Sequence, residues 1–200
     1  MSVTSFYRVF VSVFAVIFLS ACTFNNISQD TAQNTIPDVT RTIALSVAKV
    51  EVNDQYTPPL QYPNIEHTLI NPPYRRAYNA LQTMFRPQGA QDTLELNIID
   101  ASITQSNTQE TYQNFRFWNN RHEREYFAQI QVQALLKSSQ PPSTIKGQGA
   151  VSVTRTLKLS ENASIAKREE ALNRIVVEMV GDLQREMEKI LDQKLLIVLR

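Results

Sequence analysis

Apolar and polar side chains alternate in residues 124–137, REYFAQIQVQALLK. Successive side chains of a strand point to opposite faces of a sheet. One apolar face and one wet face are typical of an antiparallel sheet that is covered on a single side. The apolar face comprises Tyr126, Ala128, Ile130, Val132, Ala134 and Leu136, and the wet face carries Gln129, Gln131 and Gln133.

The same alternation predicts three further strands around this stretch. In residues 145–159 the apolar positions keep one phase throughout. The phase changes within residues 42–52, which indicates a bulge, and it slips at Ile99 within residues 93–104. Residues 105–122 lie between the second and third strands as a long polar excursion. The sequence therefore predicts a four-stranded, mostly antiparallel sheet.

Two segments repeat apolar residues at spacings of three and four, which predicts amphipathic helices. The shorter follows Asn71, which can cap it, and holds Pro72 and Pro73 in its first turn, where missing N–H groups do little harm. The longer spans about residues 164–193, and Gly181 within it marks either a kink or a close-packing point. The two stripes comprise Tyr74, Ala77, Tyr78, Leu81, Met84 and Phe85, and Ile165, Leu172, Val176, Met179, Leu183, Met187 and Ile190.

The expected order of elements is β-α-β-β-β-α. Both helices must bury their stripes against the one apolar face of the sheet, which predicts an α+β fold, a two-layer sandwich with two helices on one face. We expect residues 41–200 to form a single domain of this kind. The apolar tail KLLIVLR, residues 194–200, can dock either on the sheet or on another protein.

The amino terminus carries the only cysteine of the chain. Residues 9–19 form an apolar run after Arg8, which has the length of a signal-peptide core and is too short to span a bilayer. Leu19, Ser20, Ala21 and Cys22 follow, and this tetrapeptide is similar to the lipobox of bacterial lipoproteins. The resemblance implies that residues 1–21 are a lipoprotein signal peptide and that the Cys22 sulfur carries fatty acyl chains. The alternatives are a plain secretory signal and a short uncleaved anchor helix.

Residues 22–40 would then be the lipidated cysteine and a flexible tether, because residues 23–40 are polar and lack Lys and Arg. Eighteen residues of flexible chain have a typical reach of roughly 25 Å. Thr23 follows Cys22, which in many enteric-type bacteria favours the outer membrane over the inner membrane. We therefore expect a periplasm-facing domain that is lipid-anchored in the outer membrane, with the inner membrane as the second choice.

Catalysis, metal binding and nucleic-acid binding are not expected. Without residues 1–21 the chain has as many acidic as basic residues, so no broad attraction for nucleic acid arises. No nucleophile elbow, phosphate-binding loop or zinc-protease motif is present. His122 and Glu123 have no evident third metal ligand, and His67 beside Glu66 is better explained as an exposed loop residue than as a base. We expect no enzyme and no cofactor.

Two regions interrupt the periodic pattern and so are free to bind a partner. The first is the proline-rich loop that contains Asn64, Glu66 and His67. The second is the aromatic segment that contains Phe117 and Trp118, which can anchor a partner or fold back onto the sheet edge. We predict these five residues as partner-binding.

The resemblance extends over most of the chain. IALSVAKVEV, YTPPLQYPNIEHTLINPP, an amphipathic helix and LNIIDASI together resemble a family of small, uncharacterised bacterial envelope lipoproteins. More loosely, the chain is similar to the auxiliary lipoproteins of ABC-type lipid transport systems. These relatives carry a Trp in the first helix, whereas this chain has none there. The resemblance implies an accessory or assembly role in an envelope complex for lipid or lipopolysaccharide transport. The alternative is a module that binds a small apolar ligand.

Overall fold

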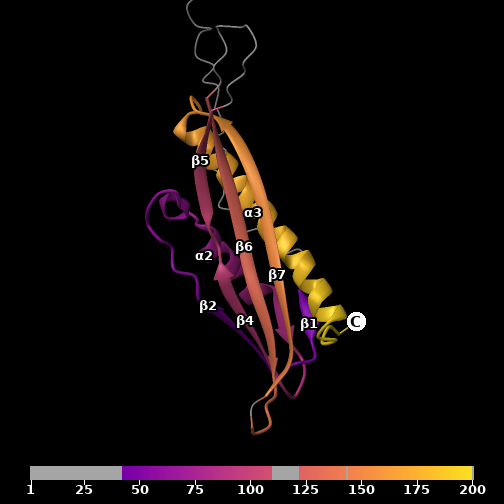
Figure 1. Ribbon diagram of the computed structural model, residues 1–200. Helices are drawn as coiled ribbons and strands as arrows, with labels where there is room; N and C mark the ends of the chain where they lie inside the picture. The colour runs from indigo at the N-terminus through magenta and orange to yellow at the C-terminus, as the bar shows by residue number, and fades with distance from the viewer. Residues whose placement is uncertain (1–41, 110–121, 143, 200) are drawn as a thin grey trace, which may run out of the picture. The chain divides into compact units, whose positions relative to one another are not determined.

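The computed structural model describes residues 42–109, 122–142 and 144–199, and these residues form an α+β fold (Figure 1). Strand β6, His122–Lys137, contains the alternating stretch and lies in the interior of the main sheet. One edge of β6 pairs along its length with β7, Ile145–Ser160, in antiparallel register. The alternation therefore correctly identified the strand on which the fold is built.

The other edge of β6 pairs with two strands in succession. β5, Ile103–Gln109, pairs with the first half of β6, and β4, Thr93–Asp100, pairs with the second half, both antiparallel. The register shifts between Ile98 and Asp100, where the sequence phase slips. One predicted strand is thus two strands, and β5 continues to Gln109 into the segment expected to be an excursion.

The main sheet is mixed, and it has five strands rather than four. β2, Lys49–Asp54, pairs with β4 in parallel, from Lys49 opposite Thr93 to Asp54 opposite Ile98. The predicted strand over 42–52 breaks at the phase change, and its first part is β1, Ile43–Leu45. β1 forms a separate parallel pair with β3, Phe85–Pro87.

The C-terminal tail pairs with β1 of the same domain. Val198 forms an antiparallel bridge with Leu45, the Ser46 N–H donates to the Ile197 carbonyl over 2.7 Å, and the Leu199 N–H donates to the Ala44 carbonyl over 2.9 Å. β1 therefore lies between β3 and the tail.

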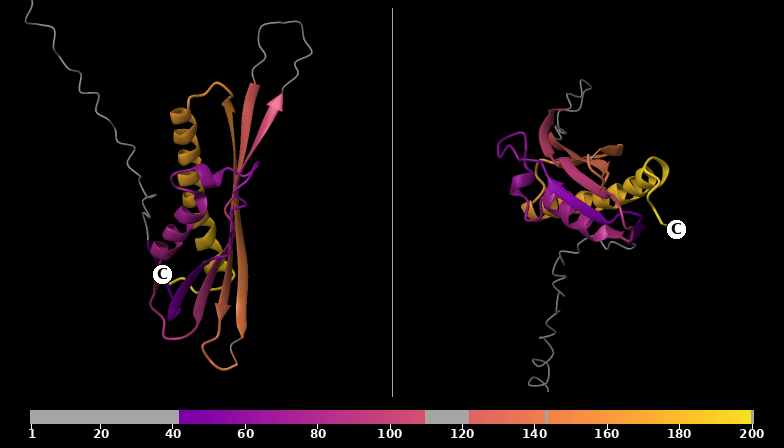
Figure 2. Two further views of the ribbon diagram at one scale, coloured as in Figure 1. Left: turned by 90° about the vertical axis from the view of Figure 1, so that its left-hand side faces the viewer. Right: turned by 90° about the horizontal axis from the view of Figure 1, so that it is seen from below.

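Both helices lie on the same face of the main sheet (Figure 2). α2 spans Pro73–Met84, and its N-cap is Pro72, one residue after the predicted cap Asn71. α3 spans Ile165–Gln193 and begins at Ser164, whose hydroxyl accepts a hydrogen bond from the Lys167 N–H over 3.2 Å. A short 3-10 helix, η2, spans Glu66–Thr68.

The core fills the space between the sheet and the two helices. Tyr126 is its largest fully buried side chain. Glycines on β7 allow α3 and the tail to approach closely. A Cβ at Gly149 would lie 2.5 Å from Ile190 Cγ2 of α3, and one at Gly147 would lie 2.6 Å from Leu195 Cδ2 of the tail. A Cβ at Gly181 would meet only Arg185 Nη1 at 3.9 Å, so Gly181 is not a close-packing point. The fully buried members of the core include Leu45, Leu81, Met84, Leu94, Leu96, Ile98, Ile103, Ile130, Leu172, Met179 and Leu183.

Candidate functional site

The loop between β2 and α2, residues 55–72, contains three of the predicted partner-binding residues. It is held against the first residues of β5 by backbone hydrogen bonds. The Ile65 N–H donates to the Ile103 carbonyl over 2.9 Å, and the Gln105 N–H donates to the Pro63 carbonyl over 2.9 Å. Asn64 and Thr104 form a bridge at the same place. The middle of the loop is therefore part of the sheet framework.

The buried carboxylate of Glu66 holds this loop on the domain. Its side chain is fully buried, and Oε1 accepts a hydrogen bond from the Tyr56 hydroxyl over 2.6 Å. Oε2 accepts from the Ile103 N–H over 3.2 Å. Burial, and then the hydrogen bond to Glu66, raise the pKa of Tyr56 well above its usual range, so the hydroxyl remains a donor. Glu66 thus positions the loop and presents no surface to a partner.

The exposed side of the loop is apolar, which the sequence reasoning missed. Leu60, Tyr62 and Ile70 are 67%, 66% and 75% exposed. His67 is exposed as well, and Asn64 is half-buried. The sequence did contain a signal for this exposed apolar surface, because large apolar residues occur in a loop that has neither helical nor strand periodicity.

The other predicted site residues lie outside the described residues. Phe117 and Trp118 fall in 110–121, and Leu19, Ser20, Ala21 and Cys22 fall in 1–41. Their roles stay predictions. Arg124, in the charged segment that precedes β6's buried stretch, pairs with Glu161 at 3.6 Å.

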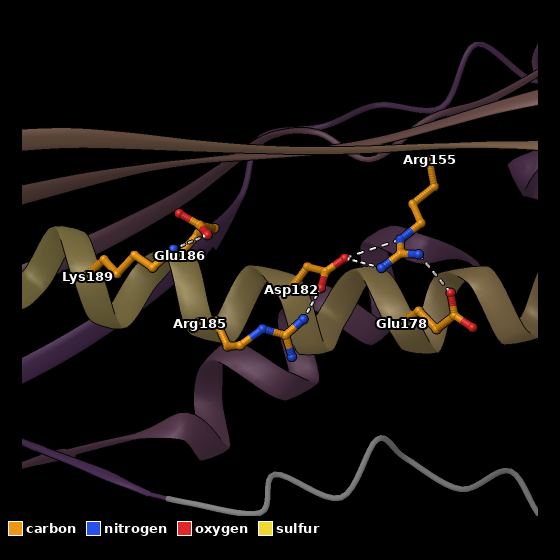
Figure 3. A network of polar contacts seen from close by, with 6 residues as sticks. All are labelled: Arg155, Glu178, Asp182, Arg185, Glu186 and Lys189. Carbon is orange, nitrogen blue, oxygen red and sulfur yellow. Dashed lines mark hydrogen bonds and ion pairs between the residues drawn. The ribbon is translucent and has the colours of Figure 1, made fainter.

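The most extensive charge network of the described residues ties α3 to β7 (Figure 3). Arg155 lies on the helix-facing side of β7, where its Nη1 donates to Glu178 Oε2 over 3.0 Å and its Nε donates to Asp182 Oδ2 over 3.1 Å. Asp182 also pairs with Arg185, and Glu186 pairs with Lys189 at 2.6 Å. The hydrogen bond to Asp182 raises the pKa of Arg155. Each of these charges has an opposite charge beside it, so the network is structural.

A groove of about 610 Å³ lies between the C-terminal half of α3 and the tail. Its charged lining mixes both signs, and it contains no Ser, Cys or His that could act as a nucleophile or base. Within the described part of the chain, no three His, Cys, Asp or Glu residues are grouped to hold a metal ion. No helix among the described residues is long and apolar enough to cross a membrane. The groove lining is Arg185, Glu188, Lys189, Asp192, Gln193, Val198 and Leu199.

Neither a family model nor a curated protein matches the chain. Among solved structures, the chain is similar to the rare lipoprotein B from Shewanella oneidensis, with 12% identity, a TM-score of 0.38, and coverage of 70% of this chain and 94% of that chain. It is also similar to a minor lipoprotein from Acinetobacter baumannii, with 9% identity, a TM-score of 0.36, and coverage of 73% and 91%. Both of these neighbours are bacterial lipoproteins by name, and neither name mentions an ABC-type transport system. TM-scores below 0.5 assign neither a family nor a function to this chain.

Proposed function

We propose that this chain is a lipid-anchored envelope protein that acts as an accessory or assembly component of a membrane complex for lipid or lipopolysaccharide transport. The observation that carries the proposal is the run Leu19-Ser20-Ala21-Cys22 directly after an apolar core of signal-peptide length. A cysteine thiolate is the best nucleophile among protein side chains for accepting an acyl-bearing group. Two or three chains anchor durably, because each buried CH₂ contributes about 0.8 kcal/mol. Thr23 favours the outer membrane as the site of anchoring, with the domain facing the periplasm.

The folded domain supports a docking role better than the alternative, a module for a small apolar ligand. The inward faces of the sheet, α2 and α3 meet in one core, so their apolar side chains are occupied by one another. The charges around Arg155 are paired, and the buried carboxylate of Glu66 is committed to Tyr56 and Ile103. What the domain leaves available is surface, and its loops are the natural places for contact.

The partner-binding residues in this proposal are Asn64 and His67 on the β2–α2 loop and Phe117 and Trp118 between β5 and β6. The balanced charge of the mature chain means that partner choice rests on apolar and hydrogen-bonding contacts rather than on long-range attraction.

Site-specific crosslinking in living cells tests the proposal. A photo-reactive amino acid would replace His67, Trp118 or, as the matched control, Ser152, which is exposed on the outward face of β7. We expect positions 67 and 118 to form an adduct with the same envelope protein, and position 152 to form none.

The double variants Phe117→Ala with Trp118→Ala, and Asn64→Ala with His67→Ala, should each reduce co-purification of that protein from detergent extracts. We expect their urea midpoints to stay close to that of the unaltered chain, because the proposal assigns these side chains to contact with the partner. Equal adducts at all three positions, or full partner recovery with both double variants, would contradict the proposed surface.

A further inference from the structure

The β2–α2 loop, which carries exposed apolar side chains, is held in a defined conformation by the rest of the domain. Leu60 has φ 57°, the left-handed region that side chains other than glycine rarely adopt. Such a conformation is strained and persists only where the surrounding structure enforces it. Here the loop is fastened by the buried Glu66 carboxylate and by its backbone bonds to β5.

This loop concentrates exposed apolar surface. Among the described residues nine large hydrophobic side chains are exposed, and Leu60, Tyr62 and Ile70 are three of them, within eleven consecutive residues. Figure 1 shows the loop standing out beside β4 and β5, at the left of the sheet, and Figure 2 shows it projecting from the domain in the view from below. A rigid projecting loop binds without the entropy cost of ordering.

The exposed part of the loop is also uncharged. Between Asp54 and Arg75 the only carboxylate is Glu66, which is buried, and no Lys or Arg occurs. Leucine and isoleucine gain from leaving water, and tyrosine is enriched where a membrane meets water because its ring is apolar and its hydroxyl is polar. A neutral loop of this kind suits the boundary between headgroups and acyl chains, whatever the headgroup charge.

The proposed anchor places such a surface within reach. The tether predicted over residues 23–40 would have a reach of roughly 25 Å. Strand β2, which leads from the start of the domain to the loop, is six residues or about 20 Å long. A bilayer to which the chain is already joined is present at a high effective concentration, so a weak additional contact suffices.

We propose that the β2–α2 loop rests on the lipid surface to which the chain is anchored, with Leu60, Tyr62 and Ile70 inserted at the headgroup boundary. This inference rests on the proposed lipid anchor at Cys22. A protein partner that is integral to the membrane would meet the domain at that same surface, so contacts through His67 are compatible with it.

Fluorescence of the full lipidated chain in vesicles tests the inference. Cys22 is the only cysteine and its sulfur is acylated in the proposed mature form, so Tyr62→Cys introduces a single reactive thiol. Ile70→Cys is a second reporter, and Ser152→Cys on the outward face of β7 is the matched control. Each purified protein would be labelled with a polarity-sensitive fluorophore and reconstituted into vesicles of phosphatidylethanolamine and phosphatidylglycerol that contain nitroxide-labelled lipid.

We expect the probes at 62 and 70 to shift to shorter wavelength and to be quenched several-fold more strongly by the nitroxide lipid than the probe at 152. Vesicle-bound protein whose probes at 62 and 70 are no more quenched than that at 152 would overturn the inference alone. A probe at position 62 that shifts to shorter wavelength in native membranes but not in lipid vesicles would overturn the inference in favour of a protein that covers the loop. Failure of the lipidated chain to float with the vesicles would overturn the anchor and the inference together.

Discussion

The close approach of α3 to β7 makes a specific prediction about Gly149. A Cβ at this position would lie 2.5 Å from Ile190 Cγ2. Isoleucine in a helix is nearly confined to one χ1 rotamer, so Ile190 cannot turn away and the helix must shift. Overpacking of this kind typically costs about 1–3 kcal/mol. Alanine recovers roughly 0.5–1 kcal/mol of the backbone entropy cost of glycine. The net loss for Gly149→Ala should therefore lie between about 0 and 2.5 kcal/mol, near 1 kcal/mol at the middle of both ranges.

Two other glycines serve as internal controls for this prediction. Gly147→Ala should cost less, because its Cβ would meet Leu195 Cδ2, the far end of a more flexible side chain. Gly181→Ala should stabilise the chain by roughly 0.5–1 kcal/mol, because the site is helical and its Cβ would have space. Urea unfolding of residues 23–200, with the three variants compared at equal m-values, gives the order. If Gly149→Ala stabilised the chain as much as Gly181→Ala, α3 would not cross β7 as described.

Two further predictions concern the core and the loop. Leu172→Ala and Leu183→Ala should each lower the free energy of unfolding by about 2–5 kcal/mol, because both side chains are buried. Gln131→Ala, on the outward face of the sheet, should lower it by less than about 0.5 kcal/mol. Similar urea midpoints for all three variants would argue against the described packing of α3 on the sheet. Tyr56→Phe leaves the Glu66 carboxylate without its hydroxyl donor and should cost about 1–3 kcal/mol, whereas Tyr62→Phe, at an exposed position, should be nearly neutral. The pKa of Tyr56 is raised in the folded state, so the stabilisation from its hydrogen bond is present below pH of about 10 and declines as the pH rises further. Above that pH the unaltered chain should therefore lose stability more steeply than Tyr56→Phe. Parallel plots of unfolding free energy against pH would contradict the hydrogen bond from Tyr56 to Glu66.

The sequence predicted well which side chains of each strand and helix are buried, and it predicted poorly which strands pair with one another. Alternation in residues 124–137 and 145–159 identified β6 and β7, and the helical stripes identified α2 and α3. The parallel pairing of β2 with β4 was missed because periodicity says which side chains share a face and not which strands are adjacent. The extent of β5 was missed because Thr104 to Gln109 are polar at every position, so only its hydrogen bonds to β6 define it as a strand.

The candidate loop was located from the sequence, but the roles of its side chains were not. Charged residues are almost never fully buried, so Glu66 was expected at the surface. Its burial depends on Tyr56, at the other end of the same loop, and on the Ile103 N–H, 37 residues further along the sequence. Conversely, the exposure of Leu60 and Tyr62 follows from how the loop is fastened to β5, which no local pattern reports.

Fatty-acid labelling shows whether Cys22 carries the lipid anchor. Cells that express the unaltered chain or Cys22→Ser would be fed a clickable fatty acid, and each protein would be isolated and its label and mass measured. A hydroxyl does not replace the thiolate as acyl acceptor, so we predict a labelled, processed, membrane-bound protein for the unaltered chain. The Cys22→Ser protein should carry no label and retain its leader or be cleaved elsewhere. Equal labelling of the two proteins would contradict the account.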